Sequence, residues 1–371
     1  MKQGGKNVGN VYFFTGFPGF ISSMLLEELI EKWAPEKIYT LVLPSMKEKA
    51  MEEKERICSS THFPQAKWEI VEGDITKSNL SLSEKQLHML AQSVTHVFHL
   101  AAIYDLAVPE DIARMVNVEG TKQVNEWVSF LPHLQRYVYF STAYVSGTRQ
   151  GVIFEHELDK GQSFKNHYEK TKFLAEVAVR EVAHNVPTTI IRPGIVVGHS
   201  KTGETMKFDG LYFMLNMFER LKFLPFIPYI GKGEAQGNFV PVDYIIEATL
   251  YLAHTDEAIG QTYHLTDPNP YKMRDIYQMM MTEYLGKEPK GILPLRLAKW
   301  AMSFSFIRKW LHVEKEALEY FECASVYDAT NARNTLAKTG ITCPDFRDVI
   351  PVMARYYRKH RHNSTKQLTI H

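Results

Sequence analysis

The sequence Val11-Tyr12-Phe13-Phe14-Thr15-Gly16-Phe17-Pro18-Gly19-Phe20-Ile21 joins an apolar strand to a glycine turn. Residues 22–30 follow with the apolar spacing of a helix. A strand, a turn and a helix in this order present backbone N–H groups and a helix N-terminus to a pyrophosphate. Gly16 permits the tight turn, and Gly19 lets the backbone approach the phosphates. The segment predicts dinucleotide binding, although a plain strand–helix turn that binds nothing has the same pattern.

Further strand-like runs alternate with helical stretches along the first half of the chain. They lie at residues 38–43, 68–74, 96–101, 137–141 and 188–193. Strands separated by helices favour βαβ units. We therefore expect an α/β fold of Rossmann type, with a doubly wound parallel sheet.

After Gly198 the pattern changes. Residues 199–236 are rich in Phe, Met, Leu and Pro. Residues 238–243 look like a return to the sheet domain, with a helix through Leu252 after them, and most of the chain beyond Tyr271 reads as helical. We predict two interleaved regions. The NAD(P)-binding domain comprises 1–198 plus about 237–266, and the mostly helical substrate-binding region comprises 199–236 plus 267–371.

Composition limits the classes of function. The chain has 371 residues, 45% hydrophobic and 23% charged, which is ordinary for a globular protein. A net charge of +1 gives no reason to expect nucleic-acid binding. The 3 cysteines are too few for a disulfide framework, and His156, His167 and His199 lack the spacing of metal ligands. We expect no metal and a reducing, cytoplasmic location.

The sequence also bears on membranes. Residues 1–10 are polar and lack the apolar core of a signal peptide. The most apolar stretch, residues 211–230, contains Glu219, Arg220, Lys222 and two prolines, so it does not resemble a membrane helix of about 20 apolar residues. We expect neither a signal peptide nor a membrane span.

A hydroxyl and a Tyr–Lys pair suggest acid–base chemistry. Thr142 follows the strand-like run at 137–141, where the carboxyl ends of parallel strands face the ligand crevice. Tyr168 and Lys172 are one helical turn apart. A nearby ammonium favours tyrosinate and brings the pKa of a tyrosine closer to neutrality. A solvated helix face is the alternative, but the glycine turn and Thr142 in the same chain favour function.

At this point the chain resembles the extended short-chain dehydrogenase/reductase superfamily over about residues 11–243. The resemblance implies roles in cofactor binding for the phosphate turn, the adenine pair, a strand end beside the cofactor and a nicotinamide loop. The corresponding residues are Gly16, Pro18, Gly19, Phe20 and Ile21, then Asp74 and Ile75, then Ala101 and Ala102, then Pro193 and Ile195. It further implies a catalytic set of Thr142, Tyr168 and Lys172, with Asn117 bending a helix and supporting a proton relay.

Within the superfamily the chain is most similar to the thioester and fatty acyl-CoA reductases, the male sterility branch. The motifs that carry this narrower resemblance are Ser-Thr-Ala-Tyr at 141–144, Asn-Phe-Val-Pro-Val-Asp at 238–243, Tyr-His-Leu-Thr-Asp-Pro at 263–268 and Tyr-Asp-Ala-Thr-Asn at 327–331. Sugar-nucleotide epimerases and hydroxysteroid dehydrogenases share versions of several of them.

Two positions depart from the pattern. Ser22 replaces a third glycine and is still small enough for close packing. Leu43 stands where these reductases commonly carry an arginine for the 2′-phosphate of NADP, but no acidic residue ends that strand to bind a free 2′-hydroxyl. Ser45, Lys47 and Lys49 lie just beyond and are suited to a phosphate. We expect NADP, with NAD left open.

The resemblance implies an NAD(P)H-dependent reductase of a long-chain acyl thioester. Tyr168 would donate a proton to the developing oxyanion, Thr142 would hydrogen-bond the same oxygen, Lys172 would tune Tyr168 and hold the ribose, and Asn117 would support proton resupply. The product is an aldehyde, or an alcohol after a second hydride. The thiol carrier, coenzyme A or a carrier protein, stays open.

Three other functions remain as alternatives. The first is a dehydrogenase or reductase of an apolar, sterol-like alcohol or ketone. A nucleotide-sugar epimerase fits less well, because its diphosphate substrate needs polar groups and residues 211–230 are mostly apolar. A non-catalytic NAD(P) sensor is disfavoured by the Tyr–Lys pair.

Two apolar segments admit two interpretations each. Residues 211–230 could form the wall of an acyl-chain tunnel or a lid, but core or a dimer face is the simpler interpretation. Residues 293–311 are basic and amphipathic, which suits either a packed helix or, at most, peripheral contact with a membrane. Members of the superfamily often dimerise through helices around 105–128 and 165–184, which leaves a homodimer open.

Overall fold

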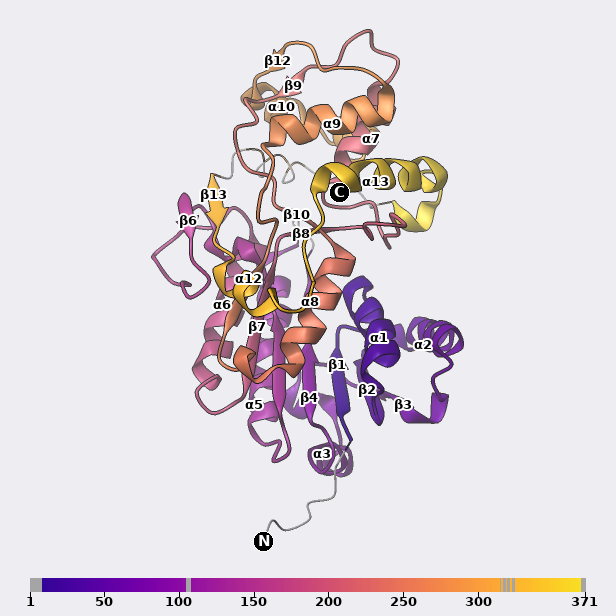
Figure 1. Ribbon diagram of the computed structural model, residues 1–371, viewed down its shortest axis with the longest axis vertical. Helices are drawn as coiled ribbons and strands as arrows, with labels where there is room; N and C mark the ends of the chain where they lie inside the picture. The colour runs from indigo at the N-terminus through magenta and orange to yellow at the C-terminus, as the bar shows by residue number, and fades with distance from the viewer. Residues whose placement is uncertain are drawn as a thin grey trace. The chain divides into compact units, whose positions relative to one another are not determined.

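A seven-stranded sheet is built outward from the strand that opens the sequence (Figure 1). In the computed structural model, which describes residues 9–104, 108–313, 315, 318, 321 and 324–367, β1 (Val11–Thr15) pairs in parallel with β2 (Lys37–Val42) and β4 (His96–His99). Parallel pairing continues to β3 (Trp68–Glu72) beyond β2, and to β5 (Arg136–Phe140) and β7 (Thr188–Pro193) beyond β4. At the far edge β11 (Thr262–Leu265) extends the sheet.

The strand order is β11-β7-β5-β4-β1-β2-β3, so the chain reverses direction across the sheet between β1 and β4. Such a switch point is where open α/β sheets bind ligands, at the carboxyl ends of the strands. The glycine turn follows β1 at this point. The predicted α/β fold with a doubly wound parallel sheet is confirmed.

The alternation of side chains along β1 explains how helices cover both faces of the sheet. Phe13 packs against Trp127, with ring centroids 4.5 Å apart, on the side of α5 (Gly120–Ser129). Its neighbour Tyr12 points the other way, and its hydroxyl lies 2.8 Å from the Nε2 atom of His254, the last residue of α8 (Val242–His254). All five residues of β1 are buried, as a strand covered on two faces requires.

The remaining helices follow the strands in sequence. They are α1 (Phe20–Trp33), α2 (Lys47–Thr61), α3 (Glu84–Ala91), α4 (Glu110–Arg114), α6 (His167–Val182), α7 (Tyr212–Leu221), α9 (Met273–Leu285), α10 (Leu295–Ala301), α11 (Ser305–Leu311), α12 (Thr330–Leu336) and α13 (Phe346–His360). Among the described residues, none of the helices is both long and apolar enough to cross a membrane.

Three further sheets have two strands each. In the first, β10 (Phe239–Pro241) pairs in parallel with β8 (Ile195–Val197). The others join β12 (Ile292–Leu293) to β9 (Tyr229–Ile230) and β13 (Ser325–Tyr327) to β6 (Gly151–Ile153). Residues 238–243, expected to return to the sheet domain, therefore contribute no strand to the seven-stranded sheet, since their strand pairs with β8.

The chain divides into two compact units. Unit 1 comprises 1–141, 171–191 and 249–263, and unit 2 comprises 142–170, 192–248 and 264–371. The division predicted from the sequence, with a boundary at Gly198, stays a prediction about function. Residues 1–8, for which no signal peptide is expected, residues 105–107 of a helix proposed for dimerisation, and parts of the C-terminal region (314, 316–317, 319–320, 322–323, 368–371) lie outside the described residues.

Unit 2 has an extensive apolar core of its own. Helices α7, α9 and α13 pack together in it, and α7 contributes buried residues along nearly its whole length. Tyr212, Met214, Leu215 and Phe218 of that helix are all less than 2% exposed. This part of the 211–230 segment is core, as the simpler interpretation of its sequence held.

Candidate active site

The glycine turn in unit 1 is closely constrained by its own backbone. The Gly19 N–H donates to the Gly16 carbonyl at 2.8 Å. Gly16 has a φ of +89°, and a Cβ placed there would lie 2.8 Å from the Ala101 nitrogen. At Gly19 a Cβ would meet the Gly16 oxygen at 2.7 Å. Only glycine fits either position, as a turn that cradles a pyrophosphate requires.

Ser22 does more than fill the place of a third glycine. Its Oγ donates to the Gly16 carbonyl at 2.8 Å and to the Gly19 carbonyl at 2.9 Å. Gly19 itself is the N-cap of α1, so the first turn of the helix begins at the predicted phosphate site. Pro18, Phe20 and Ile21 complete the turn and the first helical residues, with a cis peptide bond between Phe17 and Pro18.

The strand end next to the turn is held by a chain of hydrogen bonds. The Thr15 hydroxyl accepts from the Ala101 N–H at 3.1 Å and lies 2.7 Å from Nδ1 of His99. The other ring nitrogen of His99 lies 3.0 Å from the Thr121 hydroxyl. Burial lowers the pKa of His99 to about 3, with a smaller contribution from the Lys172 charge. His99 is therefore a neutral structural link that positions the strand end at Ala101 and Ala102.

Asn117 lies in a π-helical turn, η4 (Met115–Glu119), and is 1% exposed. Its Oδ1 accepts from the Ile103 N–H at 2.8 Å, and its Nδ2 donates to the Ile103 carbonyl and to the Thr171 hydroxyl, both at 3.0 Å. The π-helical turn interrupts the α-helical hydrogen-bond pattern at Asn117, and the predicted bend stays a prediction. These contacts fix the segment after Ala102, and the proton-relay role of Asn117 stays a prediction.

Lys172 is buried in unit 1, with 4% of its surface exposed. Its Nζ donates to the Phe140 carbonyl at the end of β5 at 2.6 Å and lies 4.6 Å from the centroid of the Tyr139 ring. Burial lowers the pKa of Lys172 to about 7, against an opposing effect of the Glu176 carboxylate. A lysine in this position changes charge near neutral pH.

Thr142 and Tyr168 belong to unit 2 and are hydrogen-bonded through their side chains. Burial raises the pKa of Tyr168 to about 12, and the bond from Thr142 only partly offsets it. Tyr168 is therefore a protonated phenol at neutral pH, which suits a proton donor. The expectation that the pKa of Tyr168 lies closer to neutrality is wrong for this structure, because burial raises that pKa.

In unit 2 the predicted nicotinamide loop is hydrogen-bonded to two of the motifs shared with thioester reductases, those at 238–243 and 263–268. After Pro193, the Gly194 N–H donates to the Leu265 carbonyl at 3.0 Å, and the Ile195 N–H donates to the Asn238 carbonyl at 2.8 Å. The Asn238 side chain in turn accepts from the Asp267 N–H at 3.1 Å. Three motifs that are distant in the sequence thus hold the loop from Pro193 to Ile195 in one conformation.

A buried polar centre in unit 2 was missed by sequence reasoning. The Glu155 carboxylate is 2% exposed and accepts from the backbone N–H groups of His264, Asn331 and Ala332 at 2.9, 2.5 and 3.2 Å. Arg192 is fully buried beside it and donates to the carbonyls of Glu155 and Glu157. Burial raises the pKa of Glu155 to about 7, outweighing the three donors. The signal available in the sequence was that Arg192 and His264 occupy buried strand positions.

The expected adenine and 2′-phosphate residues lie at the ends of β3 and β2 in unit 1. Asp74 accepts from the N–H and hydroxyl of Thr76, each at 2.8 Å, and Ile75 lies against Gly120 at the start of α5, where a Cβ would meet it at 2.8 Å. Ser45 is exposed and lies just before α2. The first residue of this helix is Lys47, whose Nζ lies 2.6 Å from Oε1 of Glu72.

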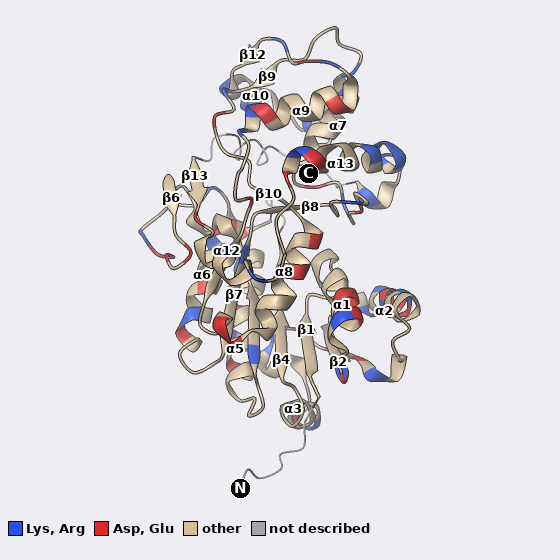
Figure 2. Cartoon of the chain, viewed as in Figure 1, with Lys and Arg blue, Asp and Glu red and all other residues tan. Residues whose placement is uncertain are grey.

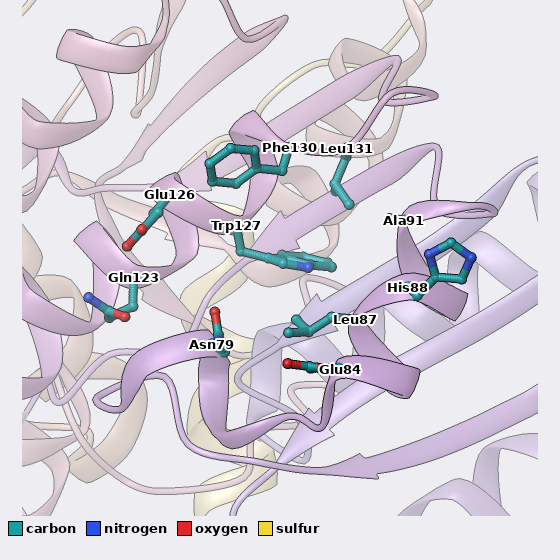
Figure 3. Close-up of a pocket in the computed structure, with 10 residues that line it drawn as sticks. All are labelled: Asn79, Glu84, Leu87, His88, Ala91, Gln123, Glu126, Trp127, Phe130 and Leu131. Carbon is teal, nitrogen blue, oxygen red and sulfur yellow. The ribbon is translucent and has the colours of Figure 1, made fainter.

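A cavity of about 350 Å³ lies elsewhere in unit 1, between α3 and α5 (Figure 3). Trp127 of α5 and Leu87 of α3 line it, with Glu84 and His88 at its rim. None of the residues predicted to bind cofactor or to act in catalysis belongs to this cavity, so it is not the predicted site.

Comparisons with known proteins agree with this geometry. Residues 14–249, more than half of the chain, match the family described as "Male sterility protein", an NAD-binding domain. The chain is 29% identical to the non-canonical nonribosomal peptide synthetase cpsA of Aspergillus campestris over 288 residues, covering 72% of this chain and 27% of that protein. It is 25% identical to the fatty acyl-CoA reductase wat of Drosophila melanogaster, covering 80% of this chain and 64% of the reductase.

Among solved structures, the chain is similar to the terminal R domain from the myxalamid PKS-NRPS biosynthetic pathway. The TM-score is 0.80 with 26% sequence identity, and the match covers 98% of this chain and 94% of that domain. The chain thus spans about a quarter of the synthetase relative but nearly all of a single R domain. The chain belongs to the male sterility family, an NAD-binding family of the extended short-chain dehydrogenase/reductase superfamily with a Rossmann fold.

Proposed function

We propose that this protein reduces a long-chain acyl thioester with NADPH and releases an aldehyde and a free thiol. The observation that carries the proposal is the Thr142–Tyr168 hydroxyl pair in a chain that matches an R domain over nearly its full length. The relatives include a fatty acyl-CoA reductase and a nonribosomal peptide synthetase. Both names are compatible with thioester substrates, one on coenzyme A and one on a carrier protein.

The glycine turn fits a dinucleotide, because the two positions where a Cβ would collide are the two that a pyrophosphate approaches. We assign the 2′-phosphate of NADPH to the exposed start of α2. Lys47 and Lys49 lie there at the positive end of the helix dipole, and Lys47 already neutralises Glu72 at the end of the neighbouring strand. Leu43 directly follows β2, and β2 itself does not end in the Asp or Glu that would bind the free 2′-hydroxyl of NAD.

When bound, the nicotinamide supplies a hydride to the thioester carbonyl carbon. The hydroxyl of Tyr168 donates its proton to the carbonyl oxygen, and Thr142 hydrogen-bonds the same oxygen as negative charge develops on it. The resulting hemithioacetal breaks its C–S bond, giving the aldehyde and the thiol. One NADPH and one proton are consumed for each aldehyde, and the balance requires a second NADPH for each alcohol.

Lys172 holds the ribose in this proposal and assists Tyr168 electrostatically. Its lowered pKa means that a nearby anionic phosphate would favour the charged form. Asn117 keeps the backbone at Ile103 in place and supports proton resupply. We also propose that the protein acts in the cytoplasm, where the two described cysteines, Cys58 and Cys343, remain free thiols.

The experiment is a paired assay of NADPH oxidation and thiol release with palmitoyl-CoA, acetyl-CoA and an apolar ketone. We expect palmitoyl-CoA to react fastest, with one NADPH oxidised per thiol if the reaction ends at the aldehyde and two if it ends at the alcohol. NADH in place of NADPH should raise KM. Oxidation of NADPH by the ketone alone, with no thiol released from either thioester, would support the alternative function and contradict the proposal.

A further inference from the structure

One surface of unit 2 exposes large apolar side chains beside basic ones. We call it the aromatic–basic surface, and it comprises the loop 222–228, β12, α10 and α11. Its most exposed rings are Phe306 at 71%, Phe223 at 70% and Trp300 at 62%. Its other exposed apolar side chains are Phe226, Ile292, Leu297, Phe304 and Trp310.

Contacts among these segments make them one continuous surface. The Lys290 N–H donates to the Ile227 carbonyl at 3.0 Å, and the pairing of β9 with β12 continues this contact. The rings of Trp300 and Phe304 lie edge to face at 5.2 Å, and Phe304 lies 5.9 Å from Phe306. Arg308 of α11 donates to the Met302 carbonyl just after α10 at 2.9 Å.

The exposed rings are not needed for packing within unit 2. Leu295, Ala298 and Met302 already bury the inner side of α10, and Ile307 and Leu311 of α11 pack against the same core. The inner sides of α10 and α11 therefore pack against the core without the exposed Trp and Phe rings, which lie on the outer sides of the two helices. A monomer that exposes several large apolar side chains together usually does so to bind something.

The charge of this surface indicates what it binds. Residues 287–311 contain six basic residues and one acidic residue, in a chain whose net charge is +1. Figure 2 shows blue segments near β12 and α10. Arg296 precedes Leu297, Lys299 precedes Trp300 and Lys309 precedes Trp310, so basic and apolar side chains are interspersed along the sequence.

We propose that the aromatic–basic surface binds the surface of a membrane that contains anionic lipids. Helices that lie in the lipid interface combine Trp, Phe and Leu with Lys and Arg, the rings entering the headgroup layer and the cations pairing with lipid phosphates. A protein partner fits less well, because protein interfaces gather apolar residues in the centre and leave charge at the rim. The inference goes beyond the proposed function and does not depend on which substrate is reduced.

The test is sedimentation of the full-length protein with vesicles. One set consists of phosphatidylcholine alone, and the other contains about one third phosphatidylglycerol, the anionic component. We expect binding to the anionic vesicles only, with a loss of binding as the salt rises from about 0.1 M to about 1 M. The double variants Trp300→Ser/Phe306→Ser and Arg296→Glu/Lys309→Glu should each lower the apparent affinity by about tenfold or more.

Two substitutions in unit 1 serve as matched controls. Phe130→Ser removes a ring that is 74% exposed, and Lys85→Glu reverses an exposed charge, and neither residue belongs to the aromatic–basic surface. Neither should change vesicle binding, and circular dichroism should show all variants folded. Failure of the wild-type protein to bind anionic vesicles would overturn the proposal, as would equal binding by the double variants. A change from dimer to monomer in the double variants, measured by light scattering, would assign the surface to a second copy of the chain instead.

Discussion

Unit 1 forms its glycine turn from one continuous stretch, whereas unit 2 forms its polar centre from distant segments. In unit 1 the strand, the turn and the helix start all lie between Val11 and Ser23. In unit 2 the Glu155 carboxylate accepts a hydrogen bond from Ala332, 177 residues away. The difference teaches that a binding turn can be found from local pattern alone, while a polar centre of this kind requires the fold.

Substitutions in the two units are also expected to affect different properties of the protein. We expect damage to the turn to remove cofactor affinity and damage to the hydroxyl pair to remove turnover without affecting that affinity. The polar centre should affect mainly the stability of unit 2 and its response to pH.

The largest effect on cofactor affinity is expected at the turn. Gly16→Ala places a Cβ 2.8 Å from the Ala101 nitrogen at a φ of +89°, so the turn must open and NADPH affinity should fall by about 100-fold or more. Fluorescence titration with NADPH measures this. Gly286→Ala is the matched control, because Gly286 also has a positive φ, +65°, but open space around its Cβ. Near-wild-type affinity in Gly16→Ala would show that the turn does not bind the pyrophosphate.

A smaller effect is expected at the hydroxyl pair. Thr142→Val removes the hydrogen bond to Tyr168 and should lower kcat for thiol release by about 10- to 100-fold while leaving the Kd for NADPH unchanged. Thr142→Ser keeps a hydroxyl and should recover most of the rate. Equal rates for the Val and Ser variants would remove Thr142 from the reaction.

The buried lysine should produce a pH-dependent stability in unit 1. Burial holds the pKa of Lys172 at about 7, below about 10.4 in an unfolded chain. The unfolded state therefore binds an extra proton between these values, so this contribution to stability is complete above the unfolded pKa and is lost as the pH falls to about 7. Relative to Lys172→Met, wild-type stability should rise by at most about 1.4 kcal/mol per pH unit in this window. Urea unfolding at several pH values measures the free energy of unfolding of both proteins. If the two plots of this free energy against pH are parallel, the predicted contribution of Lys172 is contradicted.

The smallest effect is expected in unit 2 and has the opposite sign. Burial raises the pKa of Glu155 to about 7 from its ordinary 4.5, so the native state binds the extra proton. This contribution to stability is complete below about pH 4.5 and is lost as the pH rises through about 7. Glu155→Gln should therefore lose less stability than the wild type between those two pH values, as measured by urea unfolding. If the variant loses as much stability as the wild type, another group causes the decline.

Much of unit 1 could be predicted from the sequence, for a physical reason. A buried parallel strand must be apolar along its whole length, and Gly16 and Gly19 are required by backbone sterics, so both leave a local pattern. The predicted strands at 68–74 and 96–101 end at Glu72 and His99 in the structure, because Gly73 and Leu100 already belong to the loops. Boundaries of this kind depend on hydrogen bonding rather than on side-chain pattern.

The parts that could not be predicted depend on contacts between distant residues. Residues 238–243 have the composition of a main-sheet strand, but Phe239, Val240 and Pro241 pair with β8. No local signal marks Glu155 as buried, because its burial is set by His264, Asn331 and Ala332. The pKa of Tyr168 follows from burial, which likewise cannot be read from the spacing of Tyr168 and Lys172.

The most direct test of the central claim is a measurement of Tyr168→Phe in two assays, the Kd for NADPH and the rate of thiol release from palmitoyl-CoA. The substitution removes one hydroxyl, and we expect an unchanged Kd with a rate about 100- to 10,000-fold lower. Tyr251→Phe, in α8, should change neither value. Thiol release at the wild-type rate in Tyr168→Phe would contradict the claim that this residue is the proton donor of a thioester reductase.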